Sequence, residues 1–267
     1  MGRMKKWFFV LVFMFLISAV ILSWKQSATH IFTSENRVLS ATEAPSPSPT
    51  PHIWKQSAVI NFNNAPIRIS WAIVEPKDVE LYSNLQDQKL SEEIKVNRSC
   101  STLVNGGFYS KENTHLGLFI ANFETISQPI QSALLNGYLW IDSNNIAIID
   151  TNSPKITPRV GLQSGPIIIS NSIPLALSIN NDSLNRRIVA ATTANNQLYF
   201  LVVYRDGSEY QGPLLGDLPK IVDLFAKKNN INIQNAINLD GGSASVFISN
   251  YDRLVELSHI GSYFCIK

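Results

Sequence analysis

The feature that most limits how this chain can fold is an uncharged apolar run from Trp7 to Trp24, preceded by the basic residues Arg3, Lys5 and Lys6. A helix of that length spans about 27 Å, close to the ~30 Å hydrocarbon core of a bilayer. Basic residues before the run place the N-terminus in the cytoplasm and send the rest of the chain across. A cleaved signal peptide and a retained signal anchor are the two interpretations. The lack of a good small-x-small cleavage site favours the anchor.

The segment after the apolar run is polar and then rich in proline, serine and threonine, with alternating prolines from Pro45 to Pro51. Alternating prolines stiffen a chain into polyproline II without giving it a core. We therefore expect a cytoplasmic stub and anchor at 1–24, an extended stalk at 25–52 and a folded domain at 53–267. The domain is expected on the extracytoplasmic side of the cell membrane, held there by a single transmembrane helix.

Several stretches of the domain carry strand signals. Ile67–Trp71 alternates apolar and polar residues, which is typical of a half-buried strand. Two hairpins are predicted, one over 138–149 with its turn at Asn144-Asn145 and one over 188–203 with its turn at Asn195-Asn196. Asparagine tolerates the left-handed conformation that tight hairpins need.

Helical signals are fewer. A short helix is predicted over 89–96, and apolar residues at helical spacing predict another between Asp217 and Lys228. Asp217 is the expected N-cap of this second helix, and Asn229-Asn230 its stop. Many strands with few helices predict an α+β domain built on a mixed or largely antiparallel sheet and preceded by the N-terminal transmembrane helix.

Charge and cysteine content exclude some classes of protein. The net charge is +2 with no basic face or arginine-rich run, so nucleic acid is not an expected partner. Cys100 and Cys265 stand far apart without C-x-x-C spacing, which argues against a zinc site. A disulfide formed outside the cytosol and two buried free thiols are both compatible with this spacing.

The stretch richest in chemistry is Asn238-Leu239-Asp240-Gly241-Gly242-Ser243-Ala244-Ser245. Its apolar start, from Ala236, predicts a short buried strand that delivers Asp240 into two glycines. Glycines allow positive φ and close approach of the backbone to a ligand, and successive N–H groups in such a turn can form an anion-binding nest. A tight Asp-Gly turn between strands is the alternative for this octamer taken alone.

Three further motifs are candidates for the same site. Taken one at a time, each is compatible with an ordinary turn or surface position. They are Asn105-Gly106-Gly107-Phe108, then Gln163-Ser164-Gly165-Pro166, and then Arg187 in Arg186-Arg187. Amide side chains can hold sugar hydroxyls, and a guanidinium fork matches two phosphate oxygens.

In this order, the four motifs resemble the phosphodiester glycosidase domain family, over roughly residues 61–249. The resemblance implies a hydrolase that cleaves sugar-1-phosphodiester bonds, here in envelope or exopolysaccharide material. Two departures stand out: Arg187-Ile188 replaces the Arg-Thr often seen in the family, and Gly-Ser-Ala-Ser follows Gly241 where Gly-Gly-Ser-Ser is common. The missing threonine removes a hydroxyl and puts substrate preference and activity in question.

The reaction assigns a role to each motif. Breaking the C1–O bond of a sugar-1-phosphodiester expels a phosphate monoester, so the main needs are an anion clamp and a carboxylate near C1. Asp240, Arg187 and Asn105 are the expected catalytic residues. The expected substrate contacts are Gly106, Gly107, Phe108, Gln163, Ser164, Gly165, Gly241, Gly242 and Ser243.

Two other classes of function stay open. A metal-dependent phosphodiesterase needs clustered His and Asp ligands, but the four histidines form no H-x-H or H-E-x-x-H motif. No metal site is therefore expected, although one calcium ion held by Asp240 and backbone oxygens is compatible with the sequence. The other class is a non-catalytic glycan-binding or envelope-assembly module that keeps the cleft without activity.

Overall fold

A computed structural model describes residues 56–267 of the chain. The predicted stub, anchor and stalk lie outside these residues. Within them, no helix has the length and apolar character needed to cross a membrane.

The largest element of the domain is a seven-stranded sheet whose middle strands come from the second half of the chain. In spatial order its strands are β1 (Ser57–Phe62), β2 (Ala65–Val74), β13 (Leu198–Arg205), β12 (Arg187–Thr193), β14 (Ile233–Asn238), β10 (Ile167–Ser170) and β11 (Ile173–Pro174).

The remaining strands form two five-stranded sheets. One has the order β16 (Arg253–Leu254), β15 (Phe247–Ile248), β4 (Thr102–Asn105), β17 (Ser262–Ile266) and β3 (Val79–Ser83). The other has the order β6 (Glu124–Ser127), β5 (Phe119–Ala121), β9 (Val160–Ser164), β7 (Gly137–Ile141) and β8 (Ala147–Asp150). Neighbouring strands within 56–267 pair antiparallel in all three sheets, as the sequence predicted.

Among residues 56–267 the helical elements are few and short. They are α2 (Ser91–Asn97), α3 (Leu218–Lys228) and the 3-10 turns η1 (Pro76–Asp78), η2 (Leu215–Asp217) and η3 (Gly242–Ala244). The predicted helix at 89–96 is therefore present, shifted by one or two residues, and the second predicted helix is α3.

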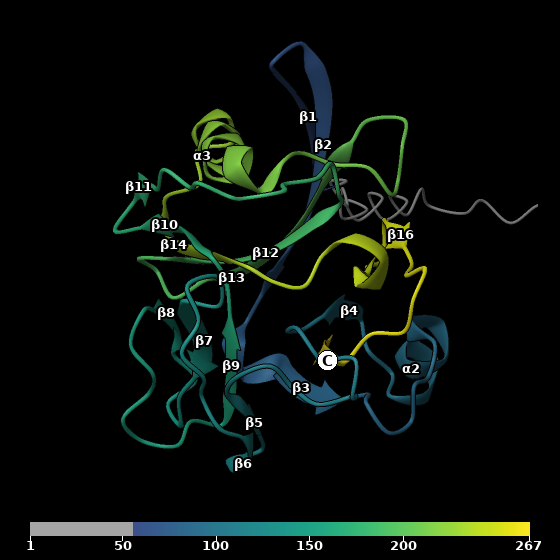
Figure 1. Ribbon diagram of the computed structural model, residues 1–267, viewed down its shortest axis with the longest axis vertical. Helices are drawn as coiled ribbons and strands as arrows, with labels where there is room; N and C mark the ends of the chain where they lie inside the picture. The colour runs from purple at the N-terminus through teal and green to yellow at the C-terminus, as the bar shows by residue number, and fades with distance from the viewer. Residues whose placement is uncertain (1–55) are drawn as a thin grey trace, which may run out of the picture. The chain divides into compact units, whose positions relative to one another are not determined.

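The seven-stranded sheet is buried on both faces at its centre, where every residue of β12 and all but the last of β13 are buried. Alternate residues of β12 and β13 face opposite sides. Val189 and Leu201 pack with Phe225 of α3, whereas Ile188 and Phe200 pack in a core shared with the other two sheets. Figure 1 shows α3 on one side of this sheet and strands β3, β4, β7 and β9 on the other.

Both predicted hairpins are confirmed. Strands β7 and β8 pair through a turn at Asn145, which has φ 60°, and β12 and β13 pair through a turn at Asn196, which has φ 56°. Asparagine takes the left-handed conformation in each, as the sequence predicted.

The start of α3 differs from the prediction. Asp217 precedes the helix, but its side chain makes no capping hydrogen bond and its backbone is already helical. Asp182, from a distant loop, caps the preceding turn η2 instead, with its carboxylate accepting from the N–H groups of Leu215 at 3.0 Å and Gly216 at 2.8 Å. A residue 35 positions away in the sequence therefore performs the expected local role.

The two cysteines form a disulfide. Cys100 and Cys265 have Cα atoms 5.3 Å apart, and the bond joins the chain just before β4 to β17, 165 residues later. This settles the alternative that the sequence left open. A disulfide is typical of a domain that folds outside the cytosol.

Candidate active site

The four sequence motifs converge on the segment that follows β14. The N–H of Asp240 donates to the carbonyl of Gly106 at 3.1 Å, and the N–H of Leu239 donates to Ile188 at 2.8 Å. The N–H of Gly165 donates to the carbonyl of Asn238 at 3.1 Å. The ends of β4, β9 and β12 therefore meet around Asp240, and each of these strands belongs to a different sheet.

Asp240 carries the carboxyl group of this junction. The residue is half-buried, and its Oδ1 accepts a hydrogen bond from the N–H of Gly241 at 2.9 Å. Burial raises the pKa of Asp240 to about 7, against the lowering effect of that hydrogen bond. A carboxyl group that changes protonation near neutral pH is suited to proton transfer or to electrostatic stabilisation.

Tyr109, the residue after the first motif, is a neighbour of this carboxyl group. Burial raises the pKa of its hydroxyl, and the negative charge of Asp240 raises it further. The hydroxyl donates to the carbonyl of His259 at 2.8 Å, and the two rings lie 5.1 Å apart between centroids. Tyr109 directly follows Phe108, which is half-buried, so the first motif supplies an aromatic wall beside Asp240.

The side chain of Asn105 is used by the protein itself. Its Nδ2 donates to the carbonyl of Asp240 at 2.7 Å, and its Oδ1 accepts from the N–H of Val246 at 2.7 Å. The amide thus bridges the two ends of the turn that starts at Asp240, and only 1% of the residue is exposed. This arrangement leaves the amide fixing the turn, where the sequence predicted contact with a sugar hydroxyl.

Gln163 and Ser164 are likewise directed into the protein. The Gln163 amide accepts from the N–H groups of Leu118 and Ile130 and donates to the carbonyls of Ile130 and Leu135. The hydroxyl of Ser164 donates to the carbonyl of Asn238 at 2.8 Å. Both residues are buried, so their side chains hold loops together around the junction and have no free group for a substrate.

The glycines of the first motif serve close packing. A Cβ on Gly106 would lie 2.5 Å from Oγ of Ser262, and one on Gly107 would lie 2.5 Å from Cδ1 of Leu162. Both glycines therefore let β4 approach its neighbours more closely than any other residue would allow.

The second glycine pair has different uses. Gly242 has φ 64°, a conformation that favours glycine, and a Cβ on Gly241 would lie 2.9 Å from the carbonyl of Arg186. The N–H of Gly241 already donates to Asp240 and that of Gly242 to Arg186. The expected nest therefore reduces to Ser243, whose N–H makes no hydrogen bond within residues 56–267 and whose hydroxyl bonds to that of Ser258 at 2.9 Å.

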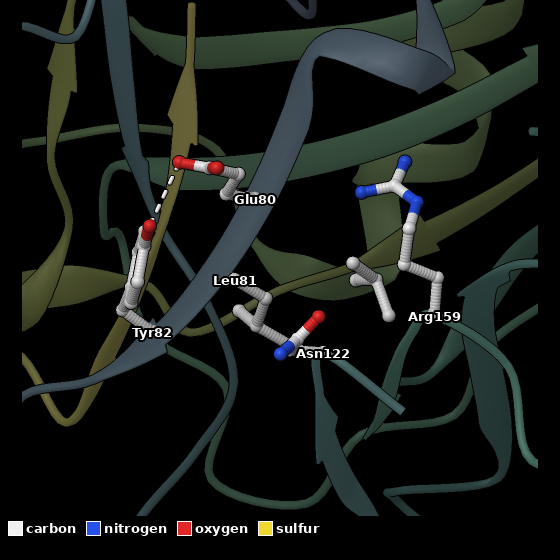
Figure 2. Close-up of a pocket in the computed structure, with 6 residues that line it drawn as sticks. Glu80, Leu81, Tyr82, Asn122 and Arg159 are labelled. Atoms are coloured by element: carbon white, nitrogen blue, oxygen red, sulfur yellow. Dashed lines mark hydrogen bonds between the residues drawn. The ribbon is translucent and has the colours of Figure 1, made fainter. Parts of the chain in front are cut away.

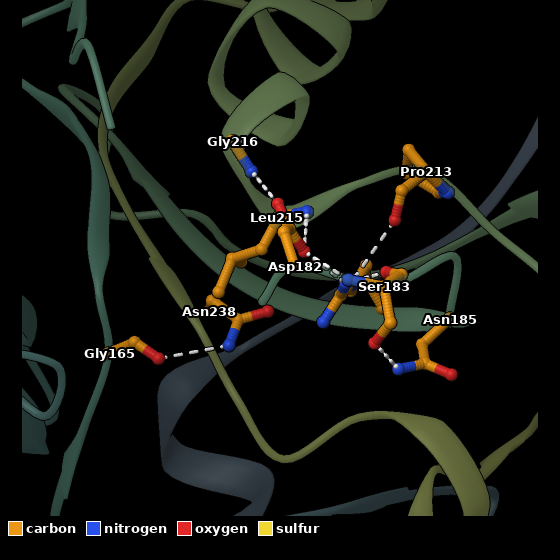
Figure 3. A network of polar contacts seen from close by, with 9 residues as sticks. Gly165, Asp182, Ser183, Asn185, Pro213, Leu215, Gly216 and Asn238 are labelled. Carbon is orange, nitrogen blue, oxygen red and sulfur yellow. Dashed lines mark hydrogen bonds and ion pairs between the residues drawn. The ribbon is translucent and has the colours of Figure 1, made fainter. Parts of the chain in front are cut away.

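Arg187 lies beside this turn and begins β12. Its Nε donates to the carbonyl of Pro213 at 3.2 Å, and its Nη2 donates to Asp182 at 3.1 Å and to the carbonyl of Ser183 at 2.5 Å (Figure 3). Its Nη1 makes no hydrogen bond within residues 56–267. Its Cδ lies 3.8 Å from the place that a Cβ on Gly241 would take, so the aliphatic part of this side chain stands next to the glycine turn.

Asp182 holds the Arg187 cation. Burial acts to raise the pKa of Asp182, but hydrogen bonds from Gly216, Leu215 and Ser183 and the charge of Arg187 outweigh it and keep the pKa below its usual range. Burial lowers the pKa of Arg187 while Asp182 raises it, and the guanidinium stays charged at neutral pH. Sequence reasoning missed Asp182 because no local pattern links it to Arg187.

Arg186 is a second cation at the turn and is completely buried. Its Nε donates to the hydroxyl of Ser245 at 2.7 Å, and its Nη atoms donate to the carbonyls of Glu209, Ser245 and Val255. The Arg186-Arg187 pair was visible in the sequence, but which arginine is enclosed depends on strand register. Arg186 holds the end of the turn in place through its hydrogen bonds to Ser245.

No three His, Cys, Asp or Glu side chains gather as metal ligands anywhere in residues 56–267. A separate cavity of about 390 Å³ lies away from the junction and is lined by Glu80, Leu81, Tyr82, Asn122, Arg159 and Val160 (Figure 2). None of these belongs to the four motifs. The guanidinium of Arg159 donates to the carbonyls of Val79 and Pro76, which is a structural role.

Comparison with known proteins identifies the family of this chain. A family profile described as phosphodiester glycosidase matches residues 98–260, more than half of the 267-residue chain. The chain therefore belongs to the phosphodiester glycosidase family. The matched segment contains all four motifs. No curated protein matches the sequence.

Two solved structures share the fold. One is the zebrafish N-acetylglucosamine-1-phosphodiester alpha-N-acetylglucosaminidase catalytic domain, described as auto-inhibited by its pro-peptide, with 17% identity, a TM-score of 0.59 and coverage of 79% of this chain and 81% of that one. The other is a hypothetical protein from Synechocystis, with 12% identity, a TM-score of 0.53 and coverage of 79% and 61%. At these identities the likeness is one of fold.

Proposed function

We propose that this protein is a membrane-anchored, extracytoplasmic hydrolase that cleaves sugar-1-phosphodiester bonds in envelope or exopolysaccharide material. Residues 1–24 would be the stub and anchor, 25–52 the stalk and 53–267 the catalytic domain. Family membership and the disulfide support the reaction class and the compartment. The observation that carries the proposal is the half-buried carboxyl of Asp240, with a pKa raised to about 7 by burial, beside a turn flanked by the Arg187 cation.

In the proposed mechanism the phosphate of the substrate lies against Arg187 Nη1 and the Ser243 N–H, two donors near the turn that have no hydrogen-bond partner within residues 56–267. Asp240, as the carboxylate, stabilises the oxocarbenium-like C1 or directs water to it. Water adds its oxygen to C1 and passes one proton to the Asp240 carboxylate, while the C1–O bond breaks and the phosphate monoester departs with the bonding electron pair. Since that leaving group is already stable, a strong general acid is less necessary than for an ordinary glycoside.

Asn105, Gln163 and Ser164 act in this scheme as positioning residues. Each fixes backbone of the junction through hydrogen bonds at 2.7 to 3.1 Å. The other carboxyl group near the first motif, Glu112, is exposed on a loop. Asp240 is therefore the single carboxyl group to which we assign a catalytic role.

The test is turnover of a panel of sugar-1-phosphodiesters by the full-length protein in oxygen-18 water. Label in the released sugar demonstrates C–O cleavage, whereas label in the phosphate indicates a phosphodiesterase. Asp240→Asn should abolish turnover, and the matched exposed variant Asp150→Asn, at the end of β8, should not. Wild-type rates in Asp240→Asn would refute the assignment, and ligand binding without product in the wild type would favour a non-catalytic glycan-binding module.

A further inference from the structure

Two adjoining cavities lie at the end of the seven-stranded sheet where β12 turns into β13. Their volumes are about 210 Å³ and about 150 Å³, and Thr193 and Ala194 line both of them. β12 begins at Arg187 and ends at Thr193, so the cavities lie about 20 Å along this strand from Arg187. β14 covers the same distance in the opposite direction, because Ile233 pairs with Thr193 and the strand then leads to Asp240. The cavities are therefore separate from the proposed catalytic site.

No charged residue lines either cavity. The two segments that supply most of the lining are uncharged over long stretches, residues 188–204 and 229–239. Amides are the most frequent polar side chains of the lining, and besides Asn196 they are Asn195, Gln197, Asn230, Asn232, Gln234 and Asn235. Each amide offers two N–H donors and a carbonyl acceptor, so this surface matches a ligand rich in hydroxyl groups and has no group that binds an ion.

Most of these amides are not used by the fold. Four of them are exposed and make no side-chain hydrogen bond with any residue that the structure describes, namely Asn195, Asn230, Asn232 and Gln234. Asn196 differs, because its amide accepts from the N–H of Ala147 and donates to the carbonyl of Asn145. The catalytic junction shows the opposite arrangement, since the amides of Asn105 and Gln163 are engaged inside the protein.

Turn geometry does not account for these amides. Asn196 and Asn230 have positive φ, a conformation for which asparagine is often selected at turns. Asn195, Asn232 and Gln234 do not have positive φ, so the backbone does not require an amide at any of these three positions.

Apolar side chains lie next to the amides. Ile146 and Ile148 of the β7–β8 hairpin line the larger cavity, and Tyr199 lines the smaller one. Ile148 also lines a third cavity of about 300 Å³, which includes the half-buried Trp140, its cross-strand neighbour. A sugar ring has hydroxyl groups at its edge and C–H groups on its faces. Amides beside aromatic and aliphatic groups are complementary to both.

We propose that this amide-lined surface is a second binding site, which takes an uncharged stretch of a glycan chain. A chain of sugars can follow a row of adjoining cavities, whereas a single small molecule occupies one of them. The two amide-lined cavities contain no cation, which nucleic acid or an acidic polymer would need. Binding here does not depend on turnover at Asp240. Together with the proposed catalytic site, it gives the protein two points of attachment to one polymer.

The test uses neutral oligosaccharides that contain no phosphodiester, so that binding is measured apart from turnover. Full-length protein in lipid nanodiscs is titrated by calorimetry with cellohexaose, laminarihexaose, mannohexaose and chitohexaose, and the heats of empty nanodiscs are subtracted. At least one of these should bind with a Kd of about 1 mM or below. The Kd should be equal at about 50 mM and about 500 mM salt, because the lining is uncharged.

Substitution of the unused amides locates the binding. Asn232→Ala and Gln234→Ala should each raise the Kd about two- to tenfold, as expected for the loss of one hydrogen bond, and the double variant should raise it about tenfold or more. The matched control is Asn250→Ala, at an exposed amide in the turn between β15 and β16, and it should leave the Kd unchanged.

Failure of every hexasaccharide to bind, or an equal Kd in the wild type and the double variant, would overturn the inference. Tighter binding of polygalacturonate that weakens with salt would also overturn it, because the site would then select an anion. A peptide of residues 40–52 is titrated in parallel. If it binds more tightly than any hexasaccharide and loses affinity in the double variant, the surface belongs to the predicted stalk of this chain. Failure of the proposed function differs from all these results, because sugar-1-phosphodiesters would not be turned over while hexasaccharide binding stayed the same.

Discussion

Replacing Asp240 by asparagine should stabilise the folded protein at neutral and alkaline pH although it abolishes the proposed activity. The carboxyl has a pKa of about 7 in the folded protein, against an ordinary value of 3.8. Between these two values the folded protein holds a proton that the unfolded chain has released. The contribution of Asp240 to stability is therefore fully present below about pH 4 and is lost as the pH rises to about 7.

The size of the effect follows from the separation of the two pKa values, about three pH units. At about 1.36 kcal/mol per unit, the free energy of unfolding of the wild type loses about 4 kcal/mol from this one group between pH 4 and pH 7. Asp240 retains some solvent contact, so the measured loss should fall between about 2 and 4 kcal/mol. An asparagine carries no charge at either pH and avoids the loss.

The assay is urea unfolding of the wild type and Asp240→Asn, with the disulfide intact, at each pH from 4 to 8. The difference in free energy of unfolding should be small at pH 4 and should favour the variant by about 2 to 4 kcal/mol at pH 8. Asp182→Asn is the matched control of opposite sign, because a lowered pKa means that the carboxylate stabilises the fold at neutral pH. A difference between wild type and Asp240→Asn that does not change with pH would refute the reasoning.

Four other outcomes are expected. If Asp240 acts as the carboxylate, kcat/KM rises about tenfold per pH unit below pH 7 and is level above it, and a profile that falls through pH 7 would instead assign it as the acid. Arg187→Lys should raise KM for a sugar-1-phosphodiester about tenfold or more, because an ammonium cannot keep the Pro213 and Asp182 contacts and also face the phosphate; an unchanged KM would remove Arg187 from the clamp. Gln163→Leu should lower the free energy of unfolding by about 3 kcal/mol or more, since buried N–H and carbonyl groups lose their partner, and a loss under about 1 kcal/mol in chemical denaturation would contradict this. Replacing Cys100 and Cys265 together by serine should lower the free energy of unfolding by about 2 to 5 kcal/mol in chemical denaturation, because the disulfide closes a long loop. Wild-type protein reduced with dithiothreitol should lose a similar amount. Equal stability of the oxidised and reduced protein would show that the disulfide does not stabilise the fold.

The local elements were predictable because their causes are local. The Asn-Asn turns at 144–145 and 195–196 each need only one residue in the left-handed conformation. That residue is Asn145 in the first turn and Asn196 in the second. The apolar spacing of 218–228 predicted α3 because one face of that helix packs on the seven-stranded sheet. The cap of η2 was not predictable, because Asp182 reaches it through tertiary structure.

In the candidate site, too, the features with local causes were predictable and those set by tertiary structure were not. The order of the motifs identified the segments that meet around Asp240, since glycine pairs and strand ends are readable in a sequence. The directions of the side chains were not readable. Asn105 and Gln163 have amides able to bind a sugar, yet tertiary packing turns both toward backbone groups that would otherwise be buried without partners. Asp182 had no sequence signal, because its importance depends on its contact with Arg187.

The enclosed guanidinium of Arg186 has an electrostatic consequence. Within residues 56–267 all its hydrogen bonds go to neutral oxygens, and Glu209 and Glu256 act on its charge only through space. Mobile ions of the solvent screen a buried charge much less than an exposed one. The contacts by which Arg186 holds the turn through Ser245 should therefore depend little on salt, and the stability that they give the turn should persist at high ionic strength.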